Sequence, residues 1–479
     1  MLDRETAAIA ISPTQPSMKV ICVHLCSSVV SLALLTGCVV GPNYEKPEAV
    51  APPQYKEAAG NWVVAKPADA VPKGKWWLAF GDSVLNELIE QVSVSNQSLA
   101  AAEARYRQSS AAVRGARASL FPTLGASGGA SRARTSQGTG SRYDVGLDAQ
   151  WEIDLWGRVR RQLEAARAGE EASAADLESI RLSLQSQLAI VYFQLRVADA
   201  GSVILEATLK AFQSSFDVTS NRYRAGVVGK VDVVQSETQL KSVEAQIIDL
   251  RATRAQLEHA LAVLIGRPPA LFTLEPNTRA LPMPVVPPGV PSTLLERRPD
   301  IAAAERRMAA ANARIGVAQA AYYPSLSLTG SAGFASSSLA DLFSAPSRVW
   351  ALGAGLAGTI LDFGARAADV ETARAAYDET VADYRQTVLA AFQEVEDNLA
   401  LVRWLGEETR VQDDATRLAR ETVTLTLNQY KAGTVGSLNV VLVQAAQLNE
   451  ERSSVTLLGR RLSATVALIR ALGGTWEPQ

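Results

Sequence analysis

The sequence contains Asn221-Arg-Tyr-Arg-Ala-Gly-Val-Val-Gly-Lys-Val-Asp-Val-Val234 and, 207 residues further on, Asn428-Gln-Tyr-Lys-Ala-Gly-Thr-Val-Gly-Ser-Leu-Asn-Val-Val441. Eight of the 14 aligned positions are identical. Gly226 and Gly433 stand where the end of a helix favours a residue in the left-handed conformation. Gly229 and Gly436 end the turn. Each copy is therefore predicted to be the tip of a helical hairpin, at residues 221–234 and 428–441.

Long helical patterns lead into and out of both tips. No proline occurs between Gly157 and Arg224 or between Gly364 and Lys431, and apolar residues recur there at steps of three and four. Such a run, at ~1.5 Å per residue, predicts a helix about 100 Å long. The mean helix has only about 11 residues, so we expect these helices to be stabilised by coiled-coil packing against neighbouring helices.

Two candidate strands precede each long helix, at about 123–133 and 144–154 and again at about 325–335 and 348–361. The second strand alternates between apolar residues such as Val145 and Leu147 and polar or small residues such as Gly146 and Asp148. This pattern is typical of a transmembrane β-strand and equally of a half-buried strand in a soluble sheet. A membrane barrel needs about eight strands and tolerates no open edge. Strands of this kind in a membrane would thus require several chains to share one barrel.

The N-terminal region has the features of an export signal. Met18-Lys19 precedes an apolar run at residues 21–35, which is too short to span a membrane. Leu35-Thr36-Gly37-Cys38 fits the lipobox of a bacterial lipoprotein, which predicts cleavage before Cys38 and lipid attachment to its thiol. An ordinary signal peptide with an incidental cysteine is the alternative. Acidic residues and prolines precede Met18, so we expect Met18 to be the true start. Val39 follows the lipid site, where an aspartate would retain the lipoprotein in the inner membrane. This favours delivery to the outer membrane.

The expected organisation is a duplicated half-repeat. It comprises a signal region at 1–37, a lipidated extended arm at 38–80, a first structural repeat at 81–280, a Pro-rich linker at 281–298, a second repeat at 299–474 and a tail at 475–479. Phe121-Pro122 and Tyr323-Pro324 end matching helices before the strands. The cluster Arg297-Arg298-Pro299-Asp300 is interpreted as a helix start with salt bridges.

Composition excludes several classes of function. A net charge of −2 without a basic run argues against a nucleic-acid-binding protein. Only two histidines are present, and the three cysteines all lie within the first 38 residues, so neither a histidine-based site nor a disulfide framework is expected. The sequence has no nucleophile–base pair, metal spacing or phosphate loop that would predict an enzyme. No cofactor is expected apart from the covalent lipid on Cys38.

Several motifs are shared with one family. They are Cys38-Val-Val-Gly-Pro-Asn-Tyr-Glu-Lys-Pro47, Phe80-Gly-Asp-Ser-Val-Leu85, Asp154-Leu-Trp-Gly157, Arg297-Arg-Pro-Asp-Ile301 and the two Tyr-x-x-Gly tips. In these the chain resembles the outer-membrane factors of tripartite efflux systems, of the TolC/OprM type, in the lipoprotein branch that serves RND pumps. The resemblance covers nearly everything after Cys38.

The resemblance implies a mainly α fold with membrane β-strands. Three chains would share a twelve-stranded barrel, four strands from each, continued by an α-helical barrel built from the hairpins. The implied function is a passive exit duct for small molecules, located in the cell outer membrane, lipid-anchored and extending into the periplasm. The implied partners are a periplasmic adaptor and an inner-membrane RND-type pump, with no nucleic acid and no enzymatic activity.

The family constricts its periplasmic end on the helix after the second tip, which the resemblance places at Leu438 and Leu442. They stand four residues apart and so on one helix face. Asn439 lies beside them, and Asp232 is the polar position after the first tip. Many members have a carboxylate where this chain has Leu442 or Asn439, so we expect an apolar constriction that closes by packing and dewetting. The alternative is that both leucines are seam residues of the coiled coil.

Tip residues are also expected to contact partners. Tyr223 and Tyr430 either bridge neighbouring hairpins in the closed state or pack the turns. Gly226, Gly229, Gly433 and Gly436 are expected to shape the tip that the adaptor recognises.

A lipid-anchored coiled-coil scaffold or adaptor without a pore is the second hypothesis. The duplicated hairpins with strands between them favour the channel, whose exported substrates the sequence does not identify.

Overall fold

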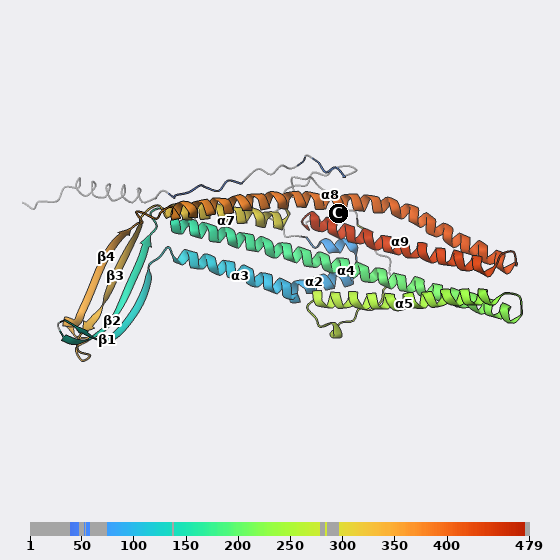
Figure 1. The fold of residues 1–479 in the computed structure, drawn as a ribbon, viewed down its shortest axis with the longest axis horizontal. Coiled ribbons are helices and arrows are strands. Elements are labelled where there is room, and N and C mark those ends of the chain that lie inside the picture. Colours follow the sequence, from blue (N-terminus) through green and yellow to red (C-terminus); the bar gives the residue numbers. More distant parts are fainter. Residues whose placement is uncertain are drawn as a thin grey trace, which may run out of the picture. The chain divides into compact units, whose positions relative to one another are not determined.

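We describe the fold from a computed structural model (Figure 1). It describes residues 39–46, 52, 54–57, 74–136, 138–277, 283–284 and 297–474. The chain divides into two compact units. One, here called the strand unit, comprises Met1–Tyr44, Val113–Ala166 and Ala311–Ala376, and the other, the helical unit, comprises Glu45–Ala112, Arg167–Ala310 and Tyr377–Gln479. Each unit contains segments of both sequence repeats, so the units cut across the duplication.

The strand unit contains one antiparallel sheet with the order β1-β2-β3-β4 (Figure 1). Its strands are β1 (Thr123–Thr135), β2 (Gly138–Ile153), β3 (Ser325–Ser336) and β4 (Arg348–Ala357). β2 starts at Gly138 instead of residue 144, because its first residues pair with β1 although they lack apolar alternation. β4 ends at Ala357 instead of residue 361, because Ala357 is opposite Ser325, the first residue of β3.

One face of this sheet carries exposed apolar side chains, and we call it the apolar face. Leu352 is 81% exposed, Trp350 76% and Leu124 72%. The register places Val145 of β2 opposite Phe334 of β3 on the same face. The other face carries small and polar residues, as the alternation of β2 predicts. A sheet with one exposed apolar face and one polar face is more typical of a surface in contact with lipid than of a surface in contact with water.

The helices repeat in length as well as in sequence. The structure has η1 (Trp76–Phe80), α2 (Ser83–Ser95), α3 (Gln97–Ala118), α4 (Arg158–Arg224), α5 (Lys230–Leu264), η2 (Pro269–Leu271), α7 (Pro299–Ala320), η3 (Ala345–Ser347), α8 (Ala365–Lys431) and α9 (Ser437–Ala471). α4 and α8 each have 67 residues, α5 and α9 each have 35, and α3 and α7 each have 22. α4 contains a window apolar enough to cross a membrane, but half of that window is buried inside the protein, as in a core helix.

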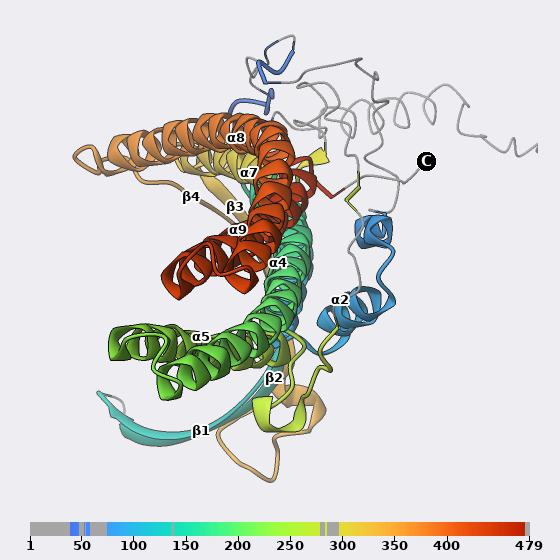
Figure 2. The ribbon, with the colours of Figure 1, turned by 90° about the vertical axis from the view of Figure 1, so that its right-hand side faces the viewer.

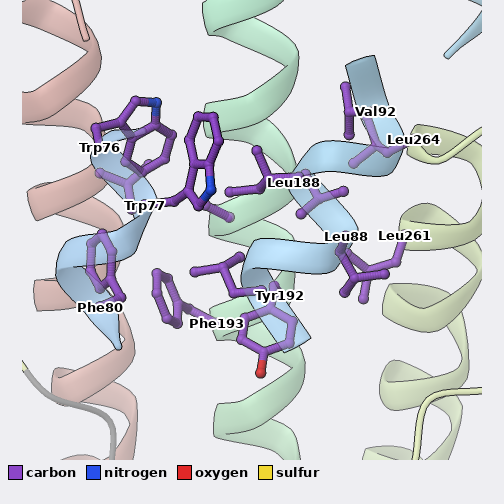
Figure 3. Close-up of a cluster of buried hydrophobic side chains, with 14 of the residues drawn as sticks. Trp76, Trp77, Phe80, Leu88, Val92, Leu188, Tyr192, Phe193, Leu261 and Leu264 are labelled. Atoms are coloured by element: carbon purple, nitrogen blue, oxygen red, sulfur yellow. The ribbon is translucent and has the colours of Figure 1, made fainter. Parts of the chain in front are cut away.

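The core of the helical unit forms where η1 and α2 pack on α4, α5 and α9 (Figure 3). Trp76, Trp77 and Phe80 lie beside α4, and the Phe80 ring lies 4.9 Å from that of Phe193. The Trp76-Trp77 pair therefore belongs to a 3₁₀ helix within the core and not to an extended arm. The Tyr192 hydroxyl donates to Asp82 at 2.6 Å, and its burial together with this bond raises the pKa of Tyr192.

Polar groups fix the starts of two helices. Asp82 caps α2, since its carboxylate accepts from the Val84 amide at 2.9 Å and from the next amide at 3.1 Å. Arg298, directly before α7, donates to Asp300 at 2.6 Å and to Glu394 at 2.8 Å. Burial alone lowers the pKa of Arg298, but the two carboxylates more than offset this and raise it. The helix start with salt bridges predicted at this cluster is therefore confirmed.

A short N-terminal segment is fixed within the strand unit. The buried Arg161 donates to the carbonyl oxygens of Val40 and Gly41 at 3.2 and 3.1 Å and to the side chain of Asn43 at 3.0 Å. Gly41 has a φ of 99° and lies against the backbone of Gly316. Residues 40–43 are thus held in place on α4 and α7. Cys38, the predicted lipid site, lies outside the described residues.

Candidate functional site: the paired hairpin tips

Both tips end their first helix with the same left-handed glycine. Gly226 has a φ of 74° and Gly433 a φ of 79°, as expected from the sequence. The Gly226 amide donates to the Tyr223 carbonyl at 2.9 Å. The next amide, of Val227, donates to the Arg222 carbonyl at 2.9 Å. Corresponding bonds of 3.1 and 3.0 Å close the second tip, so each turn satisfies the last carbonyl groups of its helix.

The second glycine of each tip begins the return helix. Gly229 and Gly436 are extended, with φ of −80° and −79°. At the first tip the Asp232 carboxylate accepts from the Gly229 amide at 3.2 Å. Asn439 holds the corresponding position at the second tip, where its backbone amide donates to the Gly436 carbonyl at 3.2 Å. The two tips therefore share a backbone path but differ in the charge at this position.

Two side-chain contacts connect the first tip to the second. The Ser437 hydroxyl donates to the Asp232 carboxylate at 2.8 Å. The guanidinium carbon of Arg222 lies 4.3 Å from the centre of the Tyr430 ring, which is a cation–π geometry. We call these four residues the clasp. In the helical unit the α4–α5 and α8–α9 hairpins run side by side with their tips at the same end (Figures 1 and 2).

The sequence identified half of the clasp. Asp232 and Tyr430 are candidate residues that the structure brings into contacts between hairpins. Arg222 and Ser437 are not among the predicted residues. A signal was present, since both lie at positions where the two copies differ, Arg222 against Gln429 and Ser437 against Lys230.

The two leucines expected at the constriction are exposed within the single chain. Leu438 is 45% and Leu442 58% exposed. The buried face of α9 near the tip instead consists of Ser437, Val440, Val441, Gln444 and Leu448. Leu438 and Leu442 therefore lie outside the seam that packs the hairpins of one chain together and are free to face another copy or a channel.

The two tip tyrosines lie in different surroundings. Tyr430 is 9% exposed and lies beneath Arg222, whereas Tyr223 is 43% exposed. Within one chain, only the second tyrosine connects the two hairpins. Tyr223 is therefore accessible at the first tip.

Comparison with known proteins gives consistent matches. The model of the family described as "Outer membrane efflux protein" matches residues 88–267 and 290–474. A relative from Pseudomonas putida strain KT2440, "Probable efflux pump outer membrane protein TtgC", is 31% identical over 95% of this chain and 96% of its own length. The structure of "the outer-membrane channel OprN" is 32% identical, covers 92% of this chain and 100% of that chain, and has a TM-score of 0.85.

The open state of the Neisseria gonorrhoeae MtrE outer membrane channel is also similar, with 31% identity, coverage of 91% of this chain and 98% of that chain, and a TM-score of 0.82. The matches span both repeats, both tips and the strands between them, so they support the channel over the scaffold. The chain belongs to the outer membrane efflux protein family and is the outer-membrane channel component of an efflux pump.

Proposed function

We propose that three copies of this chain close one twelve-stranded β-barrel in the outer membrane and form a passive exit duct. The observation that carries this proposal is the four-stranded sheet with an exposed apolar face and two edge strands, β1 and β4. Unpaired backbone groups at such edges are not tolerated in lipid. One chain has too few strands to close a barrel, for which about eight is the minimum. Pairing between copies satisfies both edges at once.

The hairpins continue the duct into the periplasm as an α-helical barrel. Their stability comes from helix packing, as in the buried stripe on α9 that includes Val440, Val441 and Leu448. Solutes cross without chemistry in the duct, and the chain has no catalytic activity of its own. The energy for export comes from an inner-membrane pump of the RND type.

The tips form the gate of this duct. Leu438 and Leu442, which are exposed and four residues apart on α9, form apolar rings when three copies meet. Such rings exclude water when they are close together. Asn439 and Asp232 line the polar margin, and the clasp holds the two tips of each chain together. The tip surface around Gly226, Gly229, Gly433 and Gly436 receives the periplasmic adaptor, whose docking separates the hairpins.

A lipid on Cys38 anchors each copy. The fixed segment at residues 40–43, held by Arg161 on α4, places the chain that follows Cys38 on the strand unit. A lipid attached at this end adds to the membrane contact of the barrel itself. Replacing Cys38 by serine is expected to prevent lipid attachment and leave the fold of the described residues unchanged, as measured by metabolic labelling with palmitate.

The assembly state and the leak of solutes test the proposal together. The detergent-extracted full chain should have the mass of three copies by light scattering. Vesicles that contain the Leu438→Ser, Leu442→Ser variant should release a small fluorescent dye faster than vesicles with the unchanged chain. Monomers without any leak from either protein would refute the duct and support a scaffold that has no pore.

A further inference from the structure

The two edge strands carry unpaired arginines on the apolar face of the sheet. In the strand register, Arg132 and Arg134 of β1 lie opposite Ser141 and Thr139 of β2, which places the two arginines on the same face as Val145. Arg348 of β4 pairs with Phe334, the residue of β3 that is opposite Val145. All three arginines are exposed, and none has a carboxylate partner within the described part of the chain. They lie at the end of the sheet away from the helices, since β1 ends there and β4 begins there.

The duplication predicts how these edges meet when copies assemble. α3 and α7 are equivalent helices, and β1 and β3 follow them; α4 and α8 are equivalent, and β2 and β4 precede them. An observed pairing confirms this equivalence. Thr123 of β1 lies opposite Gln150 of β2, and their equivalents, Ser325 of β3 and Ala357 of β4, also lie opposite each other. In the β2–β3 pair, β2 is equivalent to β4 and β3 is equivalent to β1. The same equivalence therefore predicts that β4 pairs with β1 of the next copy.

The resulting register is specific. The observed pair Ile153 and Leu326 corresponds to Ile360 opposite Leu124 of the next copy. The observed pair Tyr143 and Ser336 corresponds to Trp350 opposite Arg134 of the next copy. This register also extends β4 beyond Ala357. It covers Ile360, which is 98% exposed in the single chain.

Closure of the edges gathers the three arginines at each seam between copies. Arg132 and Arg134 lie two residues apart on one strand, about 7 Å along it. Arg348 of the adjacent strand lies one diagonal step from Arg134, about 7–8 Å away. Like charges at this spacing destabilise a sheet unless an anion lies between them. The equivalent β2–β3 seam has Tyr143, Ser336 and Phe334 on this face and no arginine, so the charge is specific to the seam between copies.

We propose, on the basis of the trimeric barrel proposed above, that this arginine cluster binds the phosphate groups of lipopolysaccharide in the outer leaflet. Leu124 and Arg132 are eight residues apart, which is about 27 Å of strand at ~3.4 Å per residue. A tilt of about 45° converts this to about 20 Å of depth, close to the ~25 Å height of a barrel's apolar band. The arginines therefore begin where the apolar band ends and lipid phosphates lie.

The side-chain chemistry fits a phosphate. Guanidinium groups bind phosphate oxygens through two parallel hydrogen bonds and keep their charge. Trp350, 76% exposed at the same seam, has the position of an aromatic residue of the interfacial girdle. A basic residue near an anionic surface contributes about 1 kcal/mol, which is about fivefold in affinity. Three arginines together are thus expected to change binding about a hundredfold.

The test measures binding of lipopolysaccharide to the purified, assembled full chain by native mass spectrometry and by titration in detergent. The triple variant Arg132→Gln, Arg134→Gln, Arg348→Gln should bind about a hundredfold more weakly than the unchanged protein. Arg142→Gln is the matched control, because Arg142 lies at the same end on the opposite face and pairs with Asp144 at 3.5 Å. Dephosphorylated lipopolysaccharide should bind as weakly to the unchanged protein as the intact lipid binds to the triple variant.

Assembly is measured separately, by disulfide formation between Ile360→Cys and Leu124→Cys of different copies. Trimers that crosslink, together with equal lipopolysaccharide binding by the triple variant, would overturn the phosphate site and leave the barrel intact. Monomers that never crosslink would overturn the barrel itself. Equal binding of phosphatidylglycerol vesicles would overturn lipopolysaccharide as the ligand.

Discussion

Loosening the clasp should open the tips. The perturbation is the double variant Arg222→Gln, Ser437→Ala, which removes the two clasp contacts between the hairpin tips of one chain. Ser437 donates to Asp232 at 2.8 Å, and Arg222 lies 4.3 Å from the Tyr430 ring centre. Alanine is the better helix former, so any loss of stability cannot come from the start of α9 itself.

The size of the effect follows from these two contacts. A hydrogen bond to a charged group contributes about 1.5–3 kcal/mol, and the lower end applies because Asp232 is partly exposed. A cation–π contact near the surface adds about 0.5–1 kcal/mol. The total of about 2 kcal/mol corresponds to a shift of about thirtyfold toward the separated hairpins in each chain.

Hydrogen exchange measures this opening at the tips themselves. Amides at residues 225–236 and 432–443 should exchange about thirtyfold faster in the double variant, because exchange follows local opening. Thr422→Ala is the matched control, since this α8 hydroxyl donates only to the Leu418 carbonyl of its own helix, at 2.8 Å. Unchanged exchange at the tips, or equal acceleration in the control, would refute the clasp as the contact that holds the tips together.

Three further outcomes are expected. Gly433→Ala should lower the stability of the tip by about 1–2 kcal/mol in chemical unfolding, because Gly433 has a φ of 79°. Gly436→Ser should be neutral or stabilising, because Gly436 has a φ of −79° and serine is a better helix cap. Equal losses of stability in the two variants would contradict this. Gln429 and Tyr223 are the repeat equivalents of Arg222 and Tyr430, so we expect Gln429→Arg to form the same cation–π contact with Tyr223 of the next copy and to lower channel current. An increase in current would argue against such a contact. Arg298→Ala removes the cation of Asp300 and the nearer of the two cations of Glu394, and should lower the unfolding free energy by about 2 kcal/mol, reduced from the value for a fully buried pair by partial exposure. A melting temperature unchanged by this substitution would contradict the last expectation.

The sequence predicts most of the architecture because the duplication can be checked against itself. The left-handed glycines Gly226 and Gly433, the proline-free helices and the alternation of β2 all have local causes that a sequence displays. The ends of β2 and β4 could not be predicted, since pairing with another strand fixes them. Gly138 joins β2 through its partner β1, and β4 stops at Ala357, opposite the residue where β3 begins.

The candidate site was predictable only in part for a similar reason. Asp232 and Tyr430 are recognisable as tip residues, but their partners Arg222 and Ser437 belong to the other hairpin. Which side chains meet across two hairpins depends on how the helices pack, and that packing is not visible in local periodicity. The resemblance placed Leu438 and Leu442 at a constriction, and their role there remains a prediction.

Single-channel currents in a planar bilayer test the central claim most directly. The assembled, unchanged protein should give small, discrete current steps, because the apolar rings of Leu438 and Leu442 close the tips. The variant Leu438→Ser, Leu442→Ser should give larger steps at the same voltage, since hydroxyl groups retain water in the constriction. Complete silence from both proteins, each verified as a trimer, would contradict the account of a duct that is gated at its hairpin tips.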